Sequence, residues 1–268
     1  MRALLASPLG FLIGLSLGAL GGGGSILAVP ALVYAAGQSP KAATTTSLIL
    51  VAITSFSGLV PHWRARRVRW GSGVMFGMAG VGGSLLGSHW NKSADPDALL
   101  LAFSGLMFIA GWAMWRRLRA ASLASVTAPA PPVEGPTPTS VEVDLNTVVK
   151  VLLAGSGVGL LTGFFGVGGG FVIVPALVLA LRFTMPEAVG TSLLVIMINS
   201  LVALATRLQA GSIEWSTVVP FTIASLLGVV VGSRLAGTRD SGSLQRWFVG
   251  LLVVVASYTA IKSAVALL

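Results

Sequence analysis

A glycine-rich stretch occurs twice in this sequence, as GLSLGALGGGGSILAVPALV at 14–33 and as GLLTGFFGVGGGFVIVPALV at 159–178. A shift of 145 residues aligns the two copies without a gap. The same shift aligns further identical residues, namely Thr46, Ser47, Leu48, Trp70 and Phe103 with Thr191, Ser192, Leu193, Trp215 and Phe248. Shared composition alone would not keep one register over so much of the chain. The sequence therefore predicts two copies of one structural unit.

Composition places both copies in a membrane. Hydrophobic residues make up 54% of the chain, charged residues only 9%, and the mean hydropathy is +0.90. A soluble domain needs roughly 25% charged residues to cover its surface, so a soluble fold is excluded. The net charge of +9 could indicate a nucleic-acid partner, but the basic residues mostly flank apolar stretches, as they do in membrane proteins. The expected partner is a lipid bilayer, and no nucleic acid is expected.

The apolar stretches define the predicted organisation. A spanning helix needs about 20 apolar residues, and eight segments qualify: 7–36, 42–61, 70–90, 97–115, 148–181, 187–206, 215–235 and 243–266. A proline-rich, acidic stretch between the fourth and fifth segments is expected outside the membrane. We predict an all-α polytopic membrane protein with two four-segment repeats, at 7–117 and 148–266, joined by a linker at 118–147.

Segments one and five differ from the others in length and in their glycine content. Each has about 30 residues and would be ~45 Å long as one helix, whereas the apolar core of a bilayer is about 30 Å thick. Each is interrupted near its middle, at 21–24 and at 166–170, by glycines that cost about 1 kcal/mol apiece in a helix. We therefore predict that both segments are broken or re-entrant. Unpaired backbone groups at such a break must face protein or water.

The distribution of basic residues favours inverted repeats. The loop at 64–69 is rich in arginine, whereas its counterpart in the second half keeps only Arg207. Parallel halves, the alternative, would place equivalent loops on the same side of the membrane. If segments one and five re-enter, each half crosses three times and the halves are inverted. One side then collects twelve basic residues: Arg64, Arg66, Arg67, Arg69, Arg116, Arg117, Arg119, Lys150, Arg182, Arg234, Arg239 and Arg246.

The glycine-rich breaks indicate a function. The half-helices after the breaks are expected to open near Ser25 and Gly170, and each presents free N–H groups and a positive dipole end. Two such ends near the bilayer midplane would bind an anion without a buried cation. The candidate residues of this site are Gly22, Gly23, Gly24, Ser25, Gly168, Gly169 and Gly170. The alternative is that glycines only permit close packing, which we expect of the G-x-x-x-G pairs Gly14/Gly18 and Gly159/Gly163.

Segments two and six carry a matched set of polar residues. Ser47 and Thr54 are seven residues apart, hence on one helical face, and they align with Ser192 and Asn199. A single hydroxyl in a membrane helix often only bonds back to the preceding turn. A duplicated stripe is harder to explain in that way, so these residues are also candidates for substrate binding. Thr46 and its counterpart Thr191 complete the set.

Ionisable residues are scarce inside the segments. No Asp or Glu lies in the middle of a segment, and only Glu187 and Glu214 lie near segment ends. Coupling to protons or sodium usually relies on an intramembrane carboxylate, so this chain is better suited to an anionic substrate. His62 and its counterpart Arg207 lie at segment ends and could line the anion's pathway. With two histidines and no cysteine, neither a metal site, a cofactor nor an enzymatic activity is expected.

The second copy of the repeat resembles a known family. The pattern GxxxGxxGxGGGxxxxP at 159–175, followed by Gly190-Thr191-Ser192, is similar to that of the TauE/SafE sulfite exporters. The first copy departs from it at Ser25 and Thr45, where the pattern has glycine. The resemblance implies a secondary transporter that exports sulfite or a small organosulfonate across the bacterial cytoplasmic membrane. An anion channel, or a permease for another small oxyanion or a carboxylate, is the alternative, and a homo-oligomer is possible.

Overall fold

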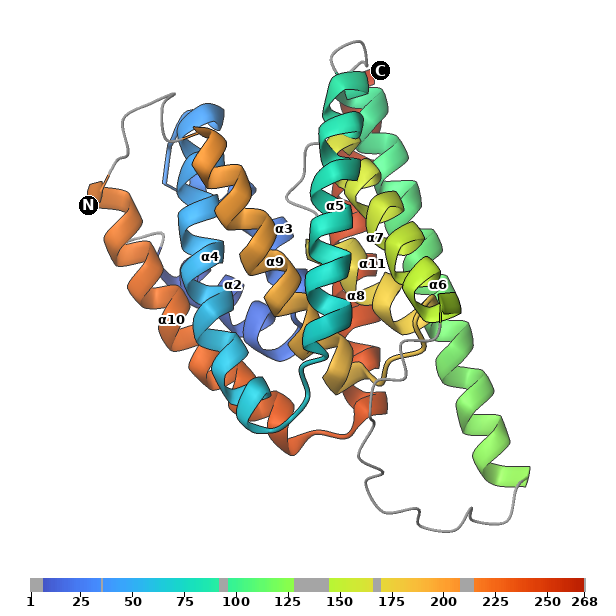
Figure 1. The fold of residues 1–268 in the computed structure, drawn as a ribbon. Helices are drawn as coiled ribbons and strands as arrows, with labels where there is room; N and C mark the ends of the chain where they lie inside the picture. Colours follow the sequence, from blue (N-terminus) through green and yellow to red (C-terminus); the bar gives the residue numbers. More distant parts are fainter. Residues whose placement is uncertain are drawn as a thin grey trace.

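All regular elements in the part of the chain that the structure describes are helices. The structure is a computed structural model that describes residues 7–34, 36–91, 96–127, 145–165, 170–207 and 215–267. Figure 1 shows the helices in two groups, one around α4 and α10 and the other around α5, α7 and α6. In chain order the elements are α2 (Ser7–Leu20), the 3-10 helix η1 (Gly22–Gly24), α3 (Ser25–Tyr34), α4 (Pro40–Arg64), α5 (Trp70–Asn91), α6 (Pro96–Thr127), α7 (Leu145–Phe165), α8 (Gly170–Leu179), α9 (Met185–Arg207), α10 (Trp215–Thr238) and α11 (Ser241–Leu267).

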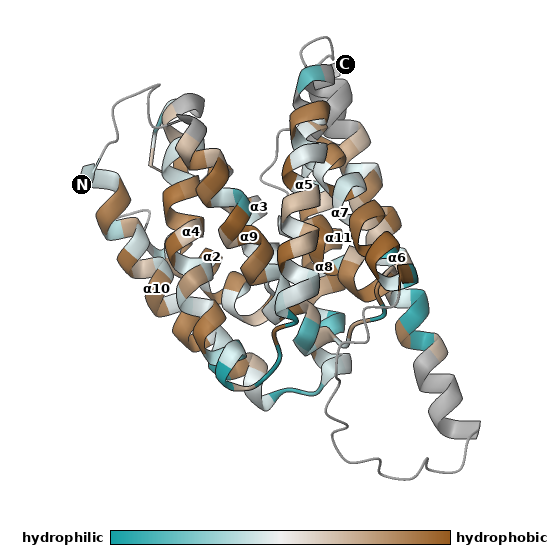
Figure 2. Ribbon diagram, viewed as in Figure 1, coloured by the Kyte–Doolittle hydropathy of each residue, from teal (hydrophilic) through white to brown (hydrophobic). Residues whose placement is uncertain are grey.

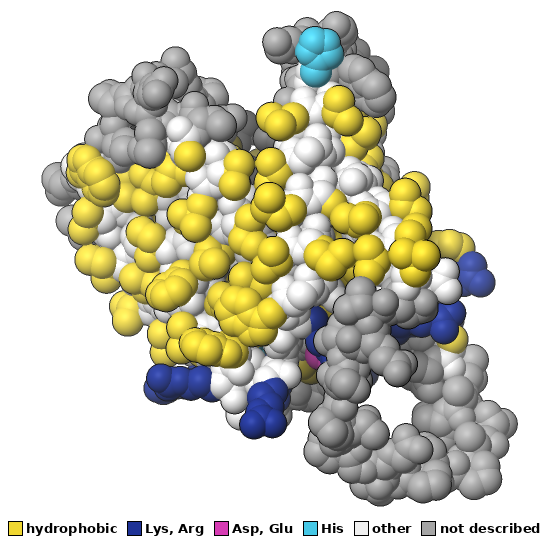
Figure 3. Space-filling model, in the orientation of Figure 1, with side chains coloured by type: hydrophobic (Ala, Val, Ile, Leu, Met, Phe, Trp, Pro, Cys, Tyr) yellow, Lys and Arg dark blue, Asp and Glu magenta, His cyan; other side chains and the backbone are white. Residues whose placement is uncertain are grey.

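The helices have the length and composition of membrane spans. In the described residues five helices are long and apolar enough to cross a bilayer: Ala42–Arg64, Leu145–Phe164, Met185–Ala205, Trp215–Thr238 and Ser241–Ile261. Figure 2 shows hydrophobic residues along the helices and hydrophilic residues concentrated at their ends. On the face in Figure 3, hydrophobic side chains cover the middle, and Lys and Arg side chains lie in the lower half of the view. This distribution fits a polytopic membrane protein.

Helices end and restart at both glycine-rich positions. In the first half α2 ends at Leu20, and α3 begins at Ser25 after the short helix η1. Gly21 has a φ of 71°, a backbone conformation that glycine adopts readily and other residues rarely adopt. In the second half α7 ends at Phe165 and α8 begins at Gly170. The first predicted break therefore occurs at the predicted place, and in the second half the described helices end and begin on either side of residues 166–169, which lie outside the described residues.

Glycine faces determine which helices pack most closely. A Cβ atom on Gly14 or Gly18 of α2 would overlap the backbone of Ser225 or Val229 on α10. In the same way, Gly159 and Gly163 of α7 face Gly80 and Ser84 on α5. In both pairs the residue numbers rise together, so the paired helices run in the same direction. The prediction that these G-x-x-x-G pairs serve close packing is confirmed.

Two other helix pairs run in opposite directions. Gly58 on α4 lies against Leu193 on α9, and His62, further along α4, lies against the earlier residue Gly190. On α6 and α11, the side-chain amide of Gln245 donates to the carbonyl oxygen of Met114 at 2.8 Å. Gly111 of α6 lies against the later residue Leu252 on α11. Both α4 with α9 and α6 with α11 are therefore antiparallel, as Figure 1 also shows for the first pair.

The turns that follow α3 and α8 have the same hydrogen bonds. The N–H of Gln38 donates to the Leu32 carbonyl, and the N–H of Phe183 donates to the Leu177 carbonyl, each at 3.1 Å. The residue before each donor, Gly37 or Arg182, has a positive φ, which is common where a helix ends and the chain turns back. The donors and the acceptors of the two turns are each 145 residues apart, which is the offset of the sequence repeat.

The predicted linker is helical in part. The helix α6 continues to Thr127, beyond the predicted start of the linker at 118, and α7 begins at Leu145. Arg116 and Arg119 extend over the rings of Trp112 and Trp115, with 4.8 and 3.8 Å between guanidinium carbon and ring centroid. Aromatic and basic residues side by side are typical of the interface between bilayer and water. The helix α6 therefore extends to this interface or beyond it, and the rest of the predicted linker, 128–144, lies outside the described residues.

Candidate functional site: the crossing of the two broken segments

The two broken segments meet in the interior. A Cβ atom on Gly22 would overlap the carbonyl oxygen of Gly170, so the backbones of the two halves are in direct contact at this point. Both glycines are buried. No residue with a side chain would fit at Gly22 without moving the facing backbone. We call the contact between residues 21–25 and the start of α8 the crossing.

The N-terminal ends of two helices face each other at the crossing. The helix α3 begins at Ser25 and α8 begins at Gly170, and a Cβ atom on Gly170 would overlap the Ser25 hydroxyl oxygen. The Ser25 hydroxyl donates to the Gly22 carbonyl at 2.8 Å. Each helix N-terminus carries roughly +0.5 of an elementary charge. Two such ends repel each other in a low-dielectric interior, and an anion between them would remove the repulsion.

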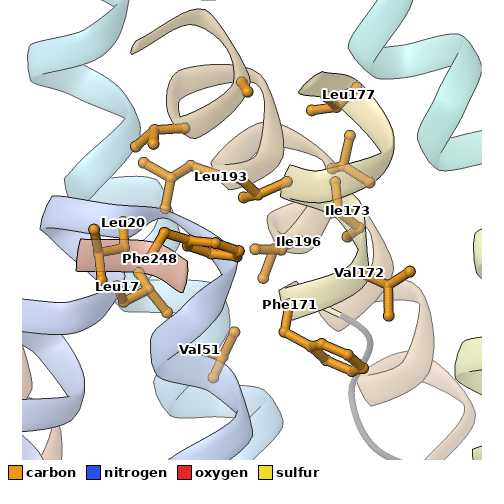
Figure 4. Packing of buried hydrophobic residues seen from close by; sticks show 14 of the residues in the cluster. Leu17, Leu20, Val51, Phe171, Val172, Ile173, Leu177, Leu193, Ile196 and Phe248 are labelled. Carbon is orange, nitrogen blue, oxygen red and sulfur yellow. The ribbon is translucent and has the colours of Figure 1, made fainter. Parts of the chain in front are cut away.

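Apolar side chains close the crossing on several sides. Leu17, Ile196 and Phe248 are buried around it, as the close-up in Figure 4 shows, together with Phe171 at the start of α8. The ring of Phe171 makes an edge-to-face contact with the ring of Phe103, with the ring centroids 4.8 Å apart. The crossing is therefore packed and dry on the sides that these residues cover.

The structure brings together some of the predicted binding residues. Gly22, Ser25 and Gly170 form the crossing, and Gly23 belongs to the helix η1 between the two limbs of the first segment. Gly24 has a different role, because a Cβ atom there would overlap Ile13 and Leu17 of α2. It permits the chain to fold back on itself. Gly168 and Gly169 lie outside the described residues.

The predicted polar stripe divides into two parts. Ser192 lies at the crossing, because a Cβ atom on Gly21 would overlap its hydroxyl oxygen. Its hydroxyl donates to the Val189 carbonyl at 2.8 Å, and Ser47 donates to the Thr44 carbonyl at the same distance. Both serines therefore bond back to the preceding turn of their own helices. Their hydroxyl oxygens can still accept a hydrogen bond.

The remaining members of the stripe have other contacts. The hydroxyl of Thr54 donates to the Leu50 carbonyl at 2.6 Å, and Thr46 is buried in α4. The amide of Asn199 faces α5, where a Cβ atom on Gly80 would lie 3.8 Å from its nitrogen. Its side-chain oxygen is buried without a hydrogen-bond partner among the described residues. Asn199 therefore lies beside α5, near its contact with α7.

Thr191 takes part in a structural network that the sequence analysis missed. Its hydroxyl oxygen accepts a hydrogen bond from the Arg69 N–H at 3.1 Å. The Arg69 guanidinium pairs with Glu187, with 2.7 Å between Nη2 and Oε1, and the other oxygen of Glu187 accepts from the N–H of Thr184 at 3.1 Å. Glu187 thus caps α9 from its third position, and the spacing Thr-x-x-Glu was the signal for it. The network fixes the arginine-rich loop between α4 and α5 to the start of α9.

The two predicted pathway cations, His62 and Arg207, lie at the ends of α4 and α9. His62 is buried in the last turn of α4, where it lines a pocket together with Arg67 and Ser233. Arg207 is the last residue of α9, and its side chain lies outside the described part of the chain. Among the described residues, no group of three or more His, Asp and Glu side chains is placed to hold a metal ion.

Comparison with known proteins identifies the family. A sequence model described as sulfite exporter TauE/SafE matches residues 6–259. The chain belongs to the TauE/SafE family. It is therefore a multi-pass membrane protein of a transporter family, as the resemblance of the second repeat indicated.

Individual relatives of this TauE/SafE member have the same general description. A probable membrane transporter protein of Xylella fastidiosa (strain 9a5c) is 36% identical over 262 residues, which cover 95% of this chain and 93% of the relative. The probable membrane transporter protein YunE of Bacillus subtilis (strain 168) is 25% identical over 264 residues, covering 94% and 91%. No solved structure matched the chain. These names describe transporters, and none of them describes an enzyme.

The Glu187 network leads to a prediction about coupling. Because Glu187 is engaged with Arg69 and Thr184, we expect Glu187→Gln to retain transport with an unchanged pH profile. We expect it to lower the stability of the purified protein by at most about 1 kcal/mol, the usual value of a partly exposed ion pair, because glutamine can still accept the hydrogen bond from Thr184. Transport in proteoliposomes and thermal unfolding in detergent measure the two effects.

Arg69→Gln is the matched control, because it removes the other half of the ion pair and leaves the carboxylate in place. The two variants should lose stability by similar amounts and keep the same transport. If Glu187→Gln uncouples transport from the proton gradient and Arg69→Gln does not, the Glu187 carboxylate is the coupling group. That result would contradict the prediction that Glu187 has only a structural role.

Proposed function

We propose that this protein is a secondary transporter for a small anion, and that the anion binds at the crossing between the N-terminal ends of α3 and α8. The single observation that supports this most strongly is the contact between Ser25 and Gly170, which brings two positive dipole ends together. No carboxylate lies in the middle of a predicted segment, so the region does not repel an anion. The family description favours sulfite or a small organosulfonate as the substrate.

The place of the crossing between the two halves favours a transporter over a channel. Buried apolar side chains such as Ile196 and Phe248 pack around it. In a transporter, the two halves rock around a fixed site and expose it to one side at a time. Binding between two broken segments, one from each half, suits that mechanism.

We also propose that the two halves are inverted repeats. A two-fold axis in the membrane plane makes equivalent helices antiparallel where they touch. The pairs α4 with α9 and α6 with α11 are equivalent under the offset of 145 residues, and both are antiparallel. The two-fold axis would also exchange the pair of α2 and α10 with the pair of α7 and α5. In both of these pairs, glycines of the first helix lie against the backbone of the second. Parallel halves would not produce antiparallel contacts between equivalent helices.

The basic end of the molecule gives the orientation. The twelve basic residues that inverted halves collect on one side include the arginine-rich loop after α4 and the loop between α10 and α11. By the positive-inside rule this end faces the cytoplasm. We propose export from the cytoplasm of a bacterial cell, across its inner membrane.

The orientation can be tested by cysteine labelling, because the chain has no cysteine of its own. We expect Ala128→Cys and Gly237→Cys to be protected from an impermeant maleimide in intact cells and to react after permeabilisation. Ser93→Cys, in the loop between α5 and α6, should react from outside and serves as the control. Reaction of Gly237→Cys from outside together with protection of Ala128→Cys would favour parallel halves.

The binding site can be tested at Ser25. We expect Ser25→Leu to weaken sulfite binding by about 100-fold, because the side chain fills the crossing and removes two or more hydrogen bonds worth about 1.5 kcal/mol each. Ser25→Gly keeps the backbone N–H groups and should bind sulfite nearly as well as the wild type. Calorimetry on the purified protein measures both.

Gly157→Leu is the matched control for bulk, because no atom lies within 4 Å of the position of a Cβ atom there. This variant should bind sulfite normally. If Ser25→Leu is folded and binds sulfite like the wild type, the anion does not bind at the crossing.

A further inference from the structure

A pocket at the basic end of the molecule has the composition of a second anion site. Its volume is about 130 Å³, and its lining residues are Pro61, His62, Ala65, Arg67, Ser233 and Gly237. A single water needs roughly 10–15 Å³ of such a cavity, so a small oxyanion fits with room for water. Among the described residues, the lining contains hydrogen-bond donors and one permanent positive charge, and no carboxylate.

His62 forms the floor of this pocket. The residue is only 3% exposed, and the backbone of Gly18 lies near its ring, but neither ring nitrogen has a hydrogen bond of regular geometry among the described residues. A buried polar group without a partner is costly. In either protonation state the ring keeps at least one N–H donor. A ligand that accepts a hydrogen bond in the pocket would therefore satisfy the histidine.

Arg67 is held beside His62 by the end of α4. The N–H of Arg67 donates to the His62 carbonyl at 2.9 Å, and Arg66 before it has a φ of 55°. This is a Schellman motif, which folds the chain back over the last turn of the helix. The positive-φ residue is an arginine instead of the usual glycine, so the turn is formed at a cost in backbone energy. The geometry places a guanidinium at the same pocket as the unpartnered imidazole.

Ser233 completes the pocket from α10. It is buried, and its hydroxyl donates to the Val230 carbonyl at 3.2 Å. That distance is at the long end for a hydroxyl donor, so the hydroxyl can turn toward a ligand. Gly237, one turn further along α10, leaves the rim open because a Cβ atom there would meet nothing within 4 Å.

The pocket adjoins the crossing through two helices. On α2, a Cβ atom on Gly18 would lie 3.0 Å from the backbone nitrogen of Ser233, and Gly18 is one turn before the break at Gly21. On α9, Gly190 lies against His62, and Ser192, two residues later, lies against Gly21. One helical turn advances about 5.4 Å. The pocket therefore lies about one turn from the crossing, on its cytoplasmic side in the proposed orientation.

We propose that this pocket is the cytoplasmic loading site of the transporter, where His62, Arg67 and Ser233 bind a small oxyanion before it reaches the crossing. The inference rests on the proposed function, because it assigns the first of two sites to the same substrate. An anion bound here would be held by side chains, whereas at the crossing it would be held by backbone N–H groups. The two sites can therefore be altered separately.

The test measures sulfite transport from each side of the membrane. In inside-out vesicles, where the cytoplasmic face is accessible, His62→Phe should raise the KM for sulfite at least ten-fold. In right-side-out vesicles its KM should stay within about two-fold of the wild type. His62→Gln, which keeps a donor at this position, should restore most of the affinity. Arg67→Gln should also raise the KM on the cytoplasmic side.

Gln245→Leu is the control for loss of a buried polar side chain near the same end, because Gln245 bonds to Met114 away from the pocket. It should leave both KM values unchanged. If His62→Phe does not fold, His62→Gln, Arg67→Gln and Ser233→Ala are compared in its place. Arg67→Gln and Ser233→Ala should then raise the cytoplasmic KM more than His62→Gln does.

The outcomes separate the two proposals. Suppose that the wild type transports sulfite, and that the pocket variants leave the cytoplasmic KM unchanged or raise both KM values equally. The proposal of a loading site is then wrong, and the proposal of a binding site at the crossing is unaffected. If the wild type transports no sulfite from either side and binds none, the proposed function fails and the loading site fails with it.

Discussion

The arrangement depends on one constraint, which is that backbone N–H and C=O groups cannot be left unpaired in lipid. A helix that breaks inside the membrane must therefore present its broken end to protein, to water or to a ligand. This chain has two such breaks, and the structure places them against each other, with Gly22 in contact with Gly170. Most of the other contacts serve to bring these two ends together and to isolate them from lipid.

Small residues make that meeting possible. The helices before the two breaks, α2 and α7, lie in close contact with α10 and α5 through glycine faces. Each half therefore packs its first helix against the third segment of the other half. The antiparallel pair of α4 and α9 lies between these two helix pairs, with α4 in contact with α10 and α9 in contact with α5. Bulky apolar residues such as Phe171 and Phe248 then surround the crossing. An anion at the crossing would lie in a region of low dielectric, where its interaction with the two helix ends is strong.

The first helix break and the close packing at glycines could be predicted from the sequence, because each depends on the residues of a short segment. The breaks follow from glycine's low helix propensity, and the close packing at Gly159 follows from its small size. The pairing of α2 with α10 could not be read from the sequence, because it depends on how two distant parts of the chain fold around each other. The same is true of the position of the Asn199 side chain, which faces α5. Gly24 was predicted to bind substrate, and in the structure it packs against its own hairpin.

The functional account makes a single physical claim, that an anion lies between the N-terminal ends of α3 and α8. Selenite has the shape and charge of sulfite, and its selenium atom scatters anomalously. The most direct measurement is therefore an anomalous diffraction map of crystals of the protein grown with selenite. The account predicts a selenium peak within hydrogen-bond distance of the backbone nitrogens near Ser25 and Gly170. Clear density for both helices with no peak at the crossing, and selenium only at arginines on the surface, would contradict it.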